Sequence, residues 1–557
     1  MIHQSDQPPV TAFGPDFPFA FDEWIRHPAG LGELPPEELG REVAIVGAGL
    51  AGIVAGFELM KLGVRPVIYE SGRLGGRLRS ERFGGAADDD IVAELGGMRF
   101  PVSGTTFHHY VDLVGLETRP FPNPLTPAAP TTVVDLAGVS HYAVTIDDLP
   151  PMFGEIAQAW DDALEKGAHL SAMKDAIRHR DADTVAAIWH GLIERWDDRT
   201  FYDFVASSES FSRLSFRHRE VFGQVGFGTG GWDSDFPNSI LEIFRVVMNE
   251  FEEDQLLITG GAERLPRRLW THEPDSLVHW PRGTSLSSLH SGAPRPGVAS
   301  LRRAGPDQIE VVDRRGNARR YRAVLSTTQS WLLTTGIEVD ESLFSHPVWM
   351  ALDRTRYMQS SKTFVMVDRP FWHDIDTATG RAPLSMTLTD RHTRGTYLFD
   401  NGPDRPGVIC LSYAWMSDAL KVLPMSAEER AELALDALAK IYPATDINSH
   451  VIGEPITVSW EADPDFLGAF KGALPGHYRY NNRMYSHFVQ ADMAARHQGI
   501  FLAGDDVSWT PGWAEGAVQT ALNAVWGIVT HLGGSTPAAN PGPGDAWSRL
   551  APLRLPE

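Results

Sequence analysis

Three glycines and one acidic residue near the N-terminus have the spacing of a dinucleotide-binding site. Gly47, Gly49 and Gly52 form the pattern GAGLAG, and Glu70 follows eighteen positions after Gly52. The first glycine allows a tight turn, the second lets the backbone approach a pyrophosphate, and the third lets a helix pack closely on a strand. A carboxylate at Glu70 can accept hydrogen bonds from a ribose diol. The alternative, a glycine-rich turn between buried elements, must produce this spacing by chance.

These residues need a strand, a turn and a helix to position them. Residues 43–46 (VAIV) are apolar and mostly β-branched, as in a buried parallel strand. Residues 51–63 are helix-like, and residues 66–70 (PVIYE) have the composition of a second strand. The N-terminus of such a helix presents unpaired N–H groups and a positive dipole end to phosphates. The sequence therefore predicts a Rossmann-like unit.

Length, charge and cysteine usage narrow the class of protein. A chain of 557 residues is too long for one ordinary core, so two or more domains are expected. The net charge of −23 is spread along the chain, which disfavours nucleic acid and anionic membranes as partners. The single cysteine, Cys410, excludes an internal disulfide framework and a cysteine-based zinc site, and we expect no metal. Because no signal-like or membrane-length apolar segment is present, we expect a cytoplasmic protein.

Two further glycine-rich motifs carry arginines. Gly76 and Arg77 lie in RLGGR, which suits a loop whose backbone and guanidinium meet a diphosphate, although a solvated basic turn has the same composition. Met98 and Arg99 lie in GGMRFP. An arginine between glycines and an aromatic–proline pair is either a ligand clamp or one half of a structural ion pair.

Together these motifs resemble the flavin-dependent amine oxidase family. VGAGLAGIVAGFEL, GRLGGRLRS and ELGGMRFP are similar to its N-terminal part, and GGMRFP resembles the branch of amino acid 2-monooxygenases, which includes enzymes acting on tryptophan and on lysine. The resemblance is strongest to the lysine 2-monooxygenases and extends from FGPDFPFAFDEW to AVQTALNAVWGI. It implies FAD as the cofactor. Neither LLITGGAERLP (256–266) nor RAVLSTT (322–328) is a second GxGxxG, and no separate nicotinamide site is visible. Electrons should therefore come from an organic substrate and leave to oxygen.

The resemblance also implies roles for three charged residues. Arg99 would bind the α-carboxylate of an amino acid, which agrees with the bidentate geometry of a guanidinium. Lys362 would hold a water against the flavin N5 and assist reoxidation, where a buried cation would stabilise charge developing on oxygen. On the residues alone, a lysine just before TFVMV could instead protect an edge strand. Asp235, in FGTGGWDSDFPNS, would accept the distal ammonium of lysine.

Aromatic residues and a second strand-to-helix signal complete the predicted site. The resemblance implies that Trp415, Phe470 and Trp513 line the substrate pocket, with core packing as the alternative for Phe470. Trp513 would also position the substrate backbone for catalysis, beside Arg99 and Lys362. The predicted cofactor-binding residues are Gly47, Gly49, Gly52, Glu70, Gly76, Arg77, Met98, Gly504, Asp505, Trp513 and Ala514. Trp513 and Ala514 begin a helix-like run, and the resemblance implies that the start of this helix faces the flavin pyrimidine carbonyl.

The distance between the two cofactor signals predicts interleaved domains in a mixed α/β fold. A discontinuous Rossmann-like FAD-binding domain would alternate with a mixed-sheet substrate-binding domain that carries extra helices. We expect the FAD-binding domain at 41–110, 252–330 and 485–535, the substrate-binding domain at 111–251 and 331–484 with a helical insertion at about 149–220, an N-terminal arm at 1–40, and a tail at 536–557.

These expectations combine into an FAD-dependent L-lysine 2-monooxygenase. It would convert L-lysine and O2 into 5-aminopentanamide, CO2 and water. The first alternative is an L-amino acid oxidase that releases the imino acid and so forms the 2-oxo acid, ammonia and hydrogen peroxide. Phe251, near the end of the pocket helix, is a candidate for controlling this confinement. A non-catalytic flavin-binding protein is the remaining alternative, and a homodimer or higher oligomer is the family expectation.

Overall fold

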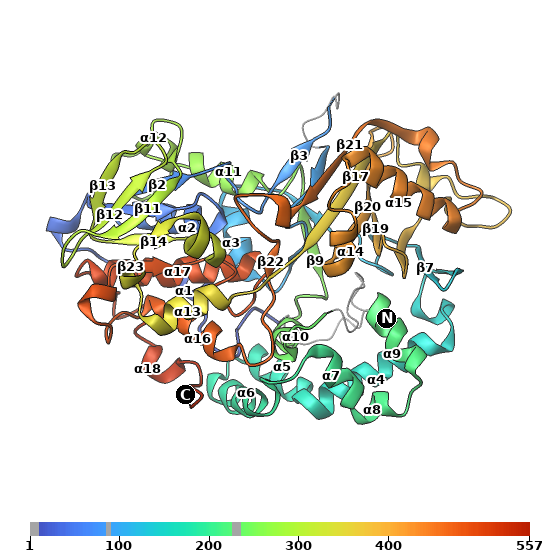
Figure 1. Ribbon diagram of the computed structural model, residues 1–557, viewed down its shortest axis with the longest axis horizontal. Coiled ribbons are helices and arrows are strands. Elements are labelled where there is room, and N and C mark those ends of the chain that lie inside the picture. Colours follow the sequence, from blue (N-terminus) through green and yellow to red (C-terminus); the bar gives the residue numbers. More distant parts are fainter. Residues whose placement is uncertain (1–9, 85–90, 226–235, 557) are drawn as a thin grey trace.

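The computed structural model describes residues 10–84, 91–225 and 236–556, so Asp235 lies outside the described part of the chain. The fold is mixed α/β, as predicted, and its two largest sheets lie toward opposite ends of the molecule (Figure 1). A layer of helices lies below both sheets in this view.

The first sheet is parallel and is assembled from distant parts of the sequence. Its strand order is β10-β2-β1-β14-β23. The strands are β1 (Glu42–Val46), β2 (Arg65–Glu70), β10 (Arg295–Pro296), β14 (Val324–Ser326) and β23 (Ile500–Leu502). Val46 pairs with Ser326, which pairs with Leu502, so these three strands end at one edge. Ligands of open parallel sheets bind beyond this carboxyl edge, and the glycine motif lies there.

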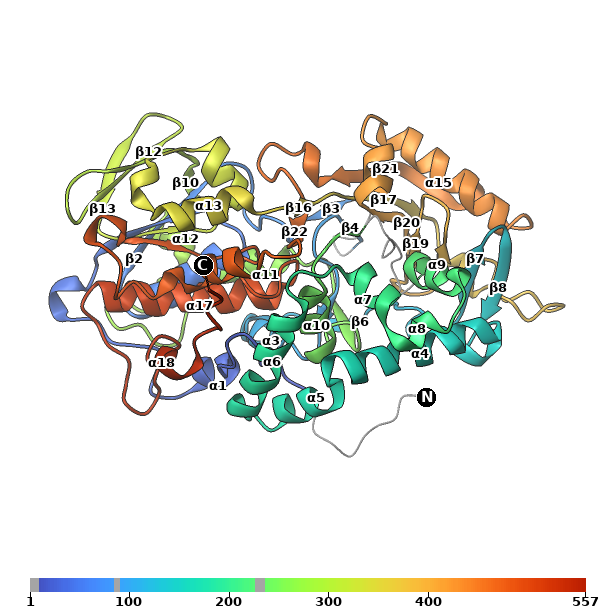
Figure 2. The same ribbon diagram turned by 60° about the horizontal axis from the view of Figure 1, so that its bottom comes forward.

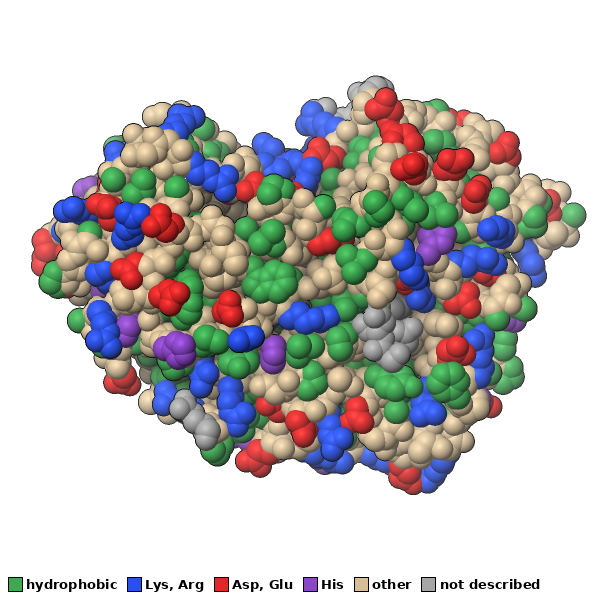
Figure 3. Space-filling model, viewed as in Figure 1, with side chains coloured by type: hydrophobic (Ala, Val, Ile, Leu, Met, Phe, Trp, Pro, Cys, Tyr) green, Lys and Arg blue, Asp and Glu red, His purple; other side chains and the backbone are tan. Residues whose placement is uncertain are grey.

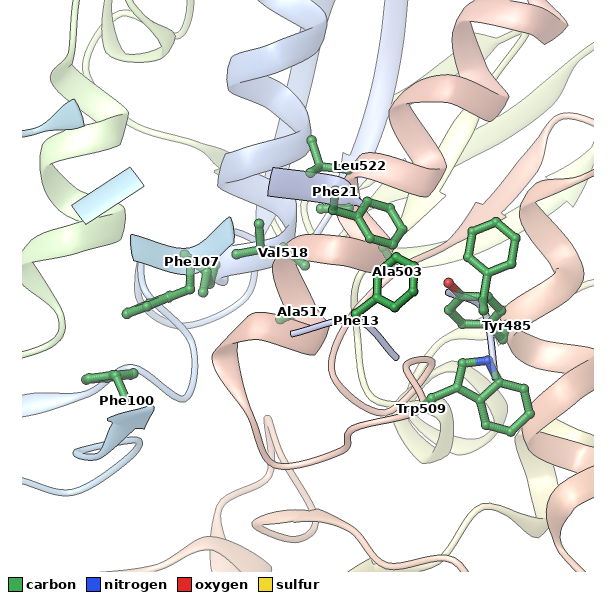
Figure 4. Packing of buried hydrophobic residues seen from close by; sticks show 14 of the residues in the cluster. Phe13, Phe21, Phe100, Phe107, Tyr485, Ala503, Trp509, Ala517, Val518 and Leu522 are labelled. Carbon is green, nitrogen blue, oxygen red and sulfur yellow. The ribbon is translucent and has the colours of Figure 1, made fainter. Parts of the chain in front are cut away.

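Two helices bury the apolar side chains beside this sheet. α2 (Leu50–Lys61) and α17 (Ala514–His531) pack against each other and are mostly buried. Figure 4 shows Val518 and Leu522 of α17 beside Phe21 of the N-terminal segment. The same segment also buries the rings of Phe13, Phe17 and Trp24, which pack on the core. α1 (Phe21–Arg26) is the only helix of this segment within residues 10–40 apart from a short 3-10 turn.

The second sheet is mixed, and it supplies the other side of the site. Its order is β21-β17-β20-β19-β18-β7-β8, in which β18 and β7 are parallel and the other pairs antiparallel. The strands are β7 (Thr132–Leu136), β8 (Val139–Ala143), β17 (Ser360–Val367), β18 (Met386–Thr389), β19 (Gly395–Phe399), β20 (Gly407–Trp415) and β21 (Val451–Ser459). α15 (Ala427–Ile441) packs on β17, β20 and β21.

The other strands that the structure describes form smaller sheets. They comprise β3 (Ser80–Arg82), β4 (Val92–Glu94), β5 (Phe100–Pro101), β6 (Thr118–Pro120), β9 (Gln255–Ile258), β11 (Val298–Arg303), β12 (Ile309–Asp313), β13 (Ala318–Tyr321), β15 (Glu338–Val339), β16 (Tyr357–Met358) and β22 (Phe470–Lys471).

Helices between β8 and α10 form a group that lies along one side of the molecule (Figure 2). They are α4 (Pro151–Ala168), α5 (Leu170–Arg178), α6 (Ala182–Trp196), α7 (Phe201–Ser207), α8 (Glu209–Ser212) and α9 (Phe216–Val225). α10 (Ile240–Met248) follows, and the Ser239 hydroxyl caps it by accepting a hydrogen bond from the Leu241 N–H at 3.3 Å. The domain bounds given above remain a prediction.

The remaining helices are α3 (Thr105–Leu113), α11 (Arg264–Thr271), α12 (Leu286–Leu289), α13 (His346–Arg354), α14 (Met416–Lys421), α16 (Tyr478–Tyr485) and α18 (Trp547–Leu550). Among the helices that the structure describes, none combines the length and the apolar character that a membrane crossing needs.

Candidate active site

Residues from widely separated motifs line one cavity. Its wall includes Gly47, Gly49, Glu70, Gly76, Arg77, Met98, Arg99, Lys362, Trp415, Phe470, Gly504, Asp505, Trp513 and Ala514. Of the other predicted residues, Gly52 lies in α2 behind the wall, and Asp235 falls outside the described residues. Figure 3 shows the molecular surface hollowed between the two lobes, where Lys and Arg side chains gather.

The glycine motif forms a cradle that side chains would fill. Gly47 has a φ of +109°, which L side chains rarely adopt. A Cβ on Gly52 would lie 2.1 Å from the Gly47 carbonyl oxygen, and a Cβ on Gly76 would lie 3.1 Å from the Gly49 Cα. The Glu70 carboxylate accepts hydrogen bonds from the Ala48 N–H at 2.7 Å and the Gly72 N–H at 2.8 Å. This close backbone approach fits the pyrophosphate and ribose of a dinucleotide.

Two helices begin at the cavity without a side-chain cap. α2 starts after Gly49 and α17 starts after Trp513, and neither of these residues accepts a capping hydrogen bond through its side chain. Leu50 and Ala514, the first residues of the two helices, line the cavity. Both helix N-termini therefore present N–H groups and positive dipole ends to a bound anion or carbonyl oxygen.

Two predicted cofactor residues also pair with each other. The Arg77 guanidinium donates to both oxygens of the Asp505 carboxylate, at 3.1 Å from Nη1 to Oδ2 and in a shorter contact from Nη2 to Oδ1. Asp505 Oδ2 also accepts from the Gly512 N–H at 3.0 Å. This bidentate pair joins the loop after β2 to the loop after β23, so it holds the two phosphate-facing segments together.

Arg99 lines the cavity and has no carboxylate partner among the described residues. Its guanidinium lies over the rings of Phe121, at 5.7 Å, and Tyr413, at 5.9 Å. Within residues 10–84, 91–225 and 236–556, no carboxylate oxygen lies within 4.0 Å of it, which removes the structural ion pair as an interpretation there. Burial opposes its charge, but Tyr397, Glu252 and Tyr413 outweigh this and raise the pKa of Arg99. The residue can therefore hold a carboxylate.

Lys362 lies on β17, which has β20 on one side and β21 on the other. The edge-strand interpretation of this lysine is therefore wrong. Its Nζ donates to the carbonyl oxygens of Glu94, at 3.1 Å, and Gly96, at 2.5 Å, and lies 4.9 Å from the centre of the Tyr413 ring. Burial lowers the pKa of Lys362 to about 8. These contacts place the ammonium beside the motif that carries Arg99.

The aromatic residues form two contacting pairs. The Trp415 and Phe470 rings are 5.7 Å apart at 75°, which is an edge-to-face arrangement. The Trp513 ring lies 5.2 Å from the ring of Phe251, which is buried. Phe251 thus supports one of the predicted wall residues from behind.

Sequence reasoning missed four charged residues that line the same cavity: Glu242, Glu252, Asp465 and Lys471. The Lys471 ammonium donates to Asn481 Oδ1 and the Ser508 carbonyl, both at 3.2 Å, and burial lowers the pKa of Lys471 to about 8. Lys471 directly follows Phe470, and Glu252 directly follows Phe251. Apart from this adjacency, no pattern separates them from surface charges.

Residues 50–529 match the family described as flavin containing amine oxidoreductase. The chain belongs to this family. It is 30% identical to a tryptophan 2-monooxygenase of Pseudomonas savastanoi, over 92% of this chain and 93% of the relative. It is 27% identical to a flavin-dependent L-tryptophan oxidase of Lentzea aerocolonigenes, over 88% and 98% of the two chains. A putrescine oxidase mutant has the same fold, with a TM-score of 0.65 and 18% identity over 88% and 99% of the chains.

Family membership makes this protein a flavin-dependent enzyme, and its cofactor is FAD. The site fits that cofactor, because the glycine cradle, the Glu70 carboxylate and the two uncapped helix starts lie in one cavity. Gly504 and the Arg77–Asp505 pair lie along the same wall.

Proposed function

We propose that this protein is an FAD-dependent L-lysine 2-monooxygenase. The observation that carries the proposal is that two cations line the same cavity as the dinucleotide cradle: the Arg99 guanidinium, which has no carboxylate partner among the described residues, and the buried Lys362 ammonium. A guanidinium suits the carboxylate of an amino acid, and the names of the similar enzymes indicate amino acid substrates.

In this proposal the chain mainly binds and orients the substrate. The chemistry that FAD would supply when bound is hydride acceptance from the substrate α-carbon and transfer of the electrons to oxygen. Arg99 holds the carboxylate bidentately and so fixes the direction of the α C–H bond. Trp415, Phe470 and Trp513 exclude water and restrict the substrate, so that orientation supplies much of the rate.

Lys362 has the complementary task of assisting the reaction with oxygen. Its ammonium is buried and is fixed by the Glu94 and Gly96 carbonyls, so its orientation needs no rearrangement during turnover. A preorganised positive charge favours the negative charge that develops on dioxygen as it is reduced.

Lysine is proposed as the substrate because FGTGGWDSDFPNS resembles the lysine-acting enzymes, which gives Asp235 the distal ammonium. In the balanced reaction, L-lysine and O2 form 5-aminopentanamide, CO2 and water. L-Tryptophan is the second candidate substrate, because the relatives reported above carry that name. The oxidase alternative, in which the imino acid escapes and is hydrolysed, uses the same binding residues.

Two measurements test the proposal. Anaerobic addition of L-lysine should bleach the FAD absorbance faster and at lower concentration than L-tryptophan does. Mass spectrometry of the aerobic products should then find 5-aminopentanamide, whereas the 2-oxo acid with stoichiometric peroxide would establish an oxidase. Failure of every amino acid to bleach the flavin would refute both activities and leave a flavin-binding protein.

A further inference from the structure

Glu252 places a carboxylate in the wall of the substrate cavity. It lies in the loop between α10 and β9, directly after Phe251, whose ring packs on Trp513. Its side chain is partly exposed, and the cavity wall that includes it also includes Arg99, Lys362 and Trp415. None of the sequence motifs pointed to this residue.

The other acids of this wall have protein partners. Glu70 accepts from two backbone N–H groups, and Asp505 pairs with Arg77. Glu242 accepts from the Ala473 N–H at 2.9 Å and from Asn238 Nδ2 at 3.1 Å, and Asp465 lies 3.7 Å from Arg314. In contrast, no hydrogen bond or ion pair joins the Glu252 carboxylate to any residue of the described chain. A carboxylate that lines a cavity without a counter-ion is only partly solvated, so its presence points to a cationic ligand group.

Glu252 and Arg99 are oppositely charged side chains that line the same cavity. Burial raises the pKa of Glu252, and the attraction of Arg99 acts in the opposite direction. The two opposite charges therefore influence each other across the cavity, yet their atoms are more than 4.0 Å apart and form no ion pair. A ligand with a carboxylate and an ammonium group satisfies both residues at once, whereas a monoamine or a plain carboxylic acid satisfies one.

We propose that Glu252 is the counter-ion of a substrate ammonium group and therefore a specificity-determining residue. This inference rests on the proposed function, because it takes Arg99 as the site of the substrate carboxylate. The ammonium has two sources in L-lysine, the α-amino group and the side chain, and L-norleucine separates them because it lacks only the side-chain ammonium.

The test is anaerobic stopped-flow reduction of the FAD enzyme by L-lysine and by L-norleucine. The variant is Glu252→Gln, which keeps the side-chain shape and removes the charge. The matched control is Glu253→Gln, which makes the same change one residue away, where the carboxylate is exposed and pairs with Lys174 at 2.6 Å. FAD content and the thermal unfolding midpoint verify the fold. Glu252→Asp is the second variant, because it retains the charge and should keep more of the affinity for lysine than the glutamine variant.

We expect Glu252→Gln to raise the apparent Kd for L-lysine about tenfold or more, as the loss of a charge-assisted hydrogen bond would. Loss confined to L-lysine assigns the side-chain ammonium, and equal loss for L-norleucine assigns the α-ammonium. If both substrates reduce the wild-type enzyme and reduce the Glu252→Gln variant equally well, the role of Glu252 is overturned and the proposed function stands. If no amino acid reduces the wild-type enzyme, the proposed function fails and this role fails with it.

Discussion

The Gly52→Ala substitution should weaken FAD binding by distorting the glycine cradle, without destabilising the helix that follows it. A Cβ on Gly52 would lie 2.1 Å from the Gly47 carbonyl oxygen, whereas real Cβ atoms essentially never approach closer than 3.0 Å. The Gly52→Ala substitution must therefore move the turn or α2 by at least the difference, 0.9 Å. The obstacle is a backbone atom of the phosphate-facing turn, so no side-chain rotation can relieve it.

The size of the effect follows from the nature of that contact. Overpacking costs typically about 1–3 kcal/mol, and a backbone clash belongs at the upper end of this range. About 3 kcal/mol corresponds to roughly 100-fold weaker FAD affinity, since the displaced turn is the part that approaches the pyrophosphate.

Gly56→Ala is the matched control in the same helix. A Cβ there would meet the ends of flexible side chains, with Ile68 Cδ1 at 3.0 Å as the nearest atom. Both substitutions improve helix propensity by about 1 kcal/mol, so propensity does not distinguish them. The assay is titration of the apoprotein with FAD, in which quenching of the flavin fluorescence reports binding. If Gly52→Ala binds FAD within threefold of the Gly56→Ala protein, the cradle argument is refuted.

Four further substitutions test the proposed roles. Arg99→Lys keeps the charge but loses the bidentate fork, so KM for L-lysine should rise about tenfold or more in steady-state kinetics, and an unchanged KM would contradict carboxylate binding. Lys362→Met should slow reoxidation by O2 about 100-fold in stopped-flow measurements. In the wild type the same rate should fall as pH rises through about 8, because the ammonium loses its proton, and the variant should show no such step. Asp235→Asn should weaken L-lysine turnover but not that of L-norleucine; equal kinetics would remove its assigned role. Phe251→Ala leaves space behind Trp513 and should raise the ratio of peroxide to CO2, whereas a constant ratio would exclude Phe251 from confinement.

The cofactor half of the site was predictable because its signals are local. The glycine spacing, the following helix and the acid at the end of the second strand determine a single backbone path, and the positive φ of Gly47 confirms the required turn. The pairing of Arg77 with Asp505 was not predictable in the same way. These residues are 428 positions apart, and each motif indicated a cofactor contact without indicating the other.

The substrate half was less predictable, because its charged residues do not repeat with any period. Residues 250–254 (EFEED) have the composition of an exposed acidic loop. In the structure, Glu250 pairs with Arg178 at 2.9 Å and Glu253 pairs with Lys174, while Glu252 lines the cavity. Which acid of a run turns inward depends on the loop after α10, where Glu250 has a φ of +55°, and composition does not encode this.

The position of the cavity wall also depends on the N-terminal segment, which is far in sequence from the residues that line the substrate side of the cavity. Arg245 of α10 donates to the Asp16 carboxylate at 2.6 and 2.9 Å, and its guanidinium lies 5.1 Å from the ring centre of Trp189 and 4.9 Å from that of Trp509. Both charged side chains are almost fully buried, and loss of one partner from such a pair costs about 3–5 kcal/mol. Because α10 also carries Glu242 of the cavity wall, the N-terminal segment fixes the helix from which the substrate loop departs. The orientation of Glu252 is therefore a property of the assembled fold, and it follows from contacts between residues more than 200 positions apart.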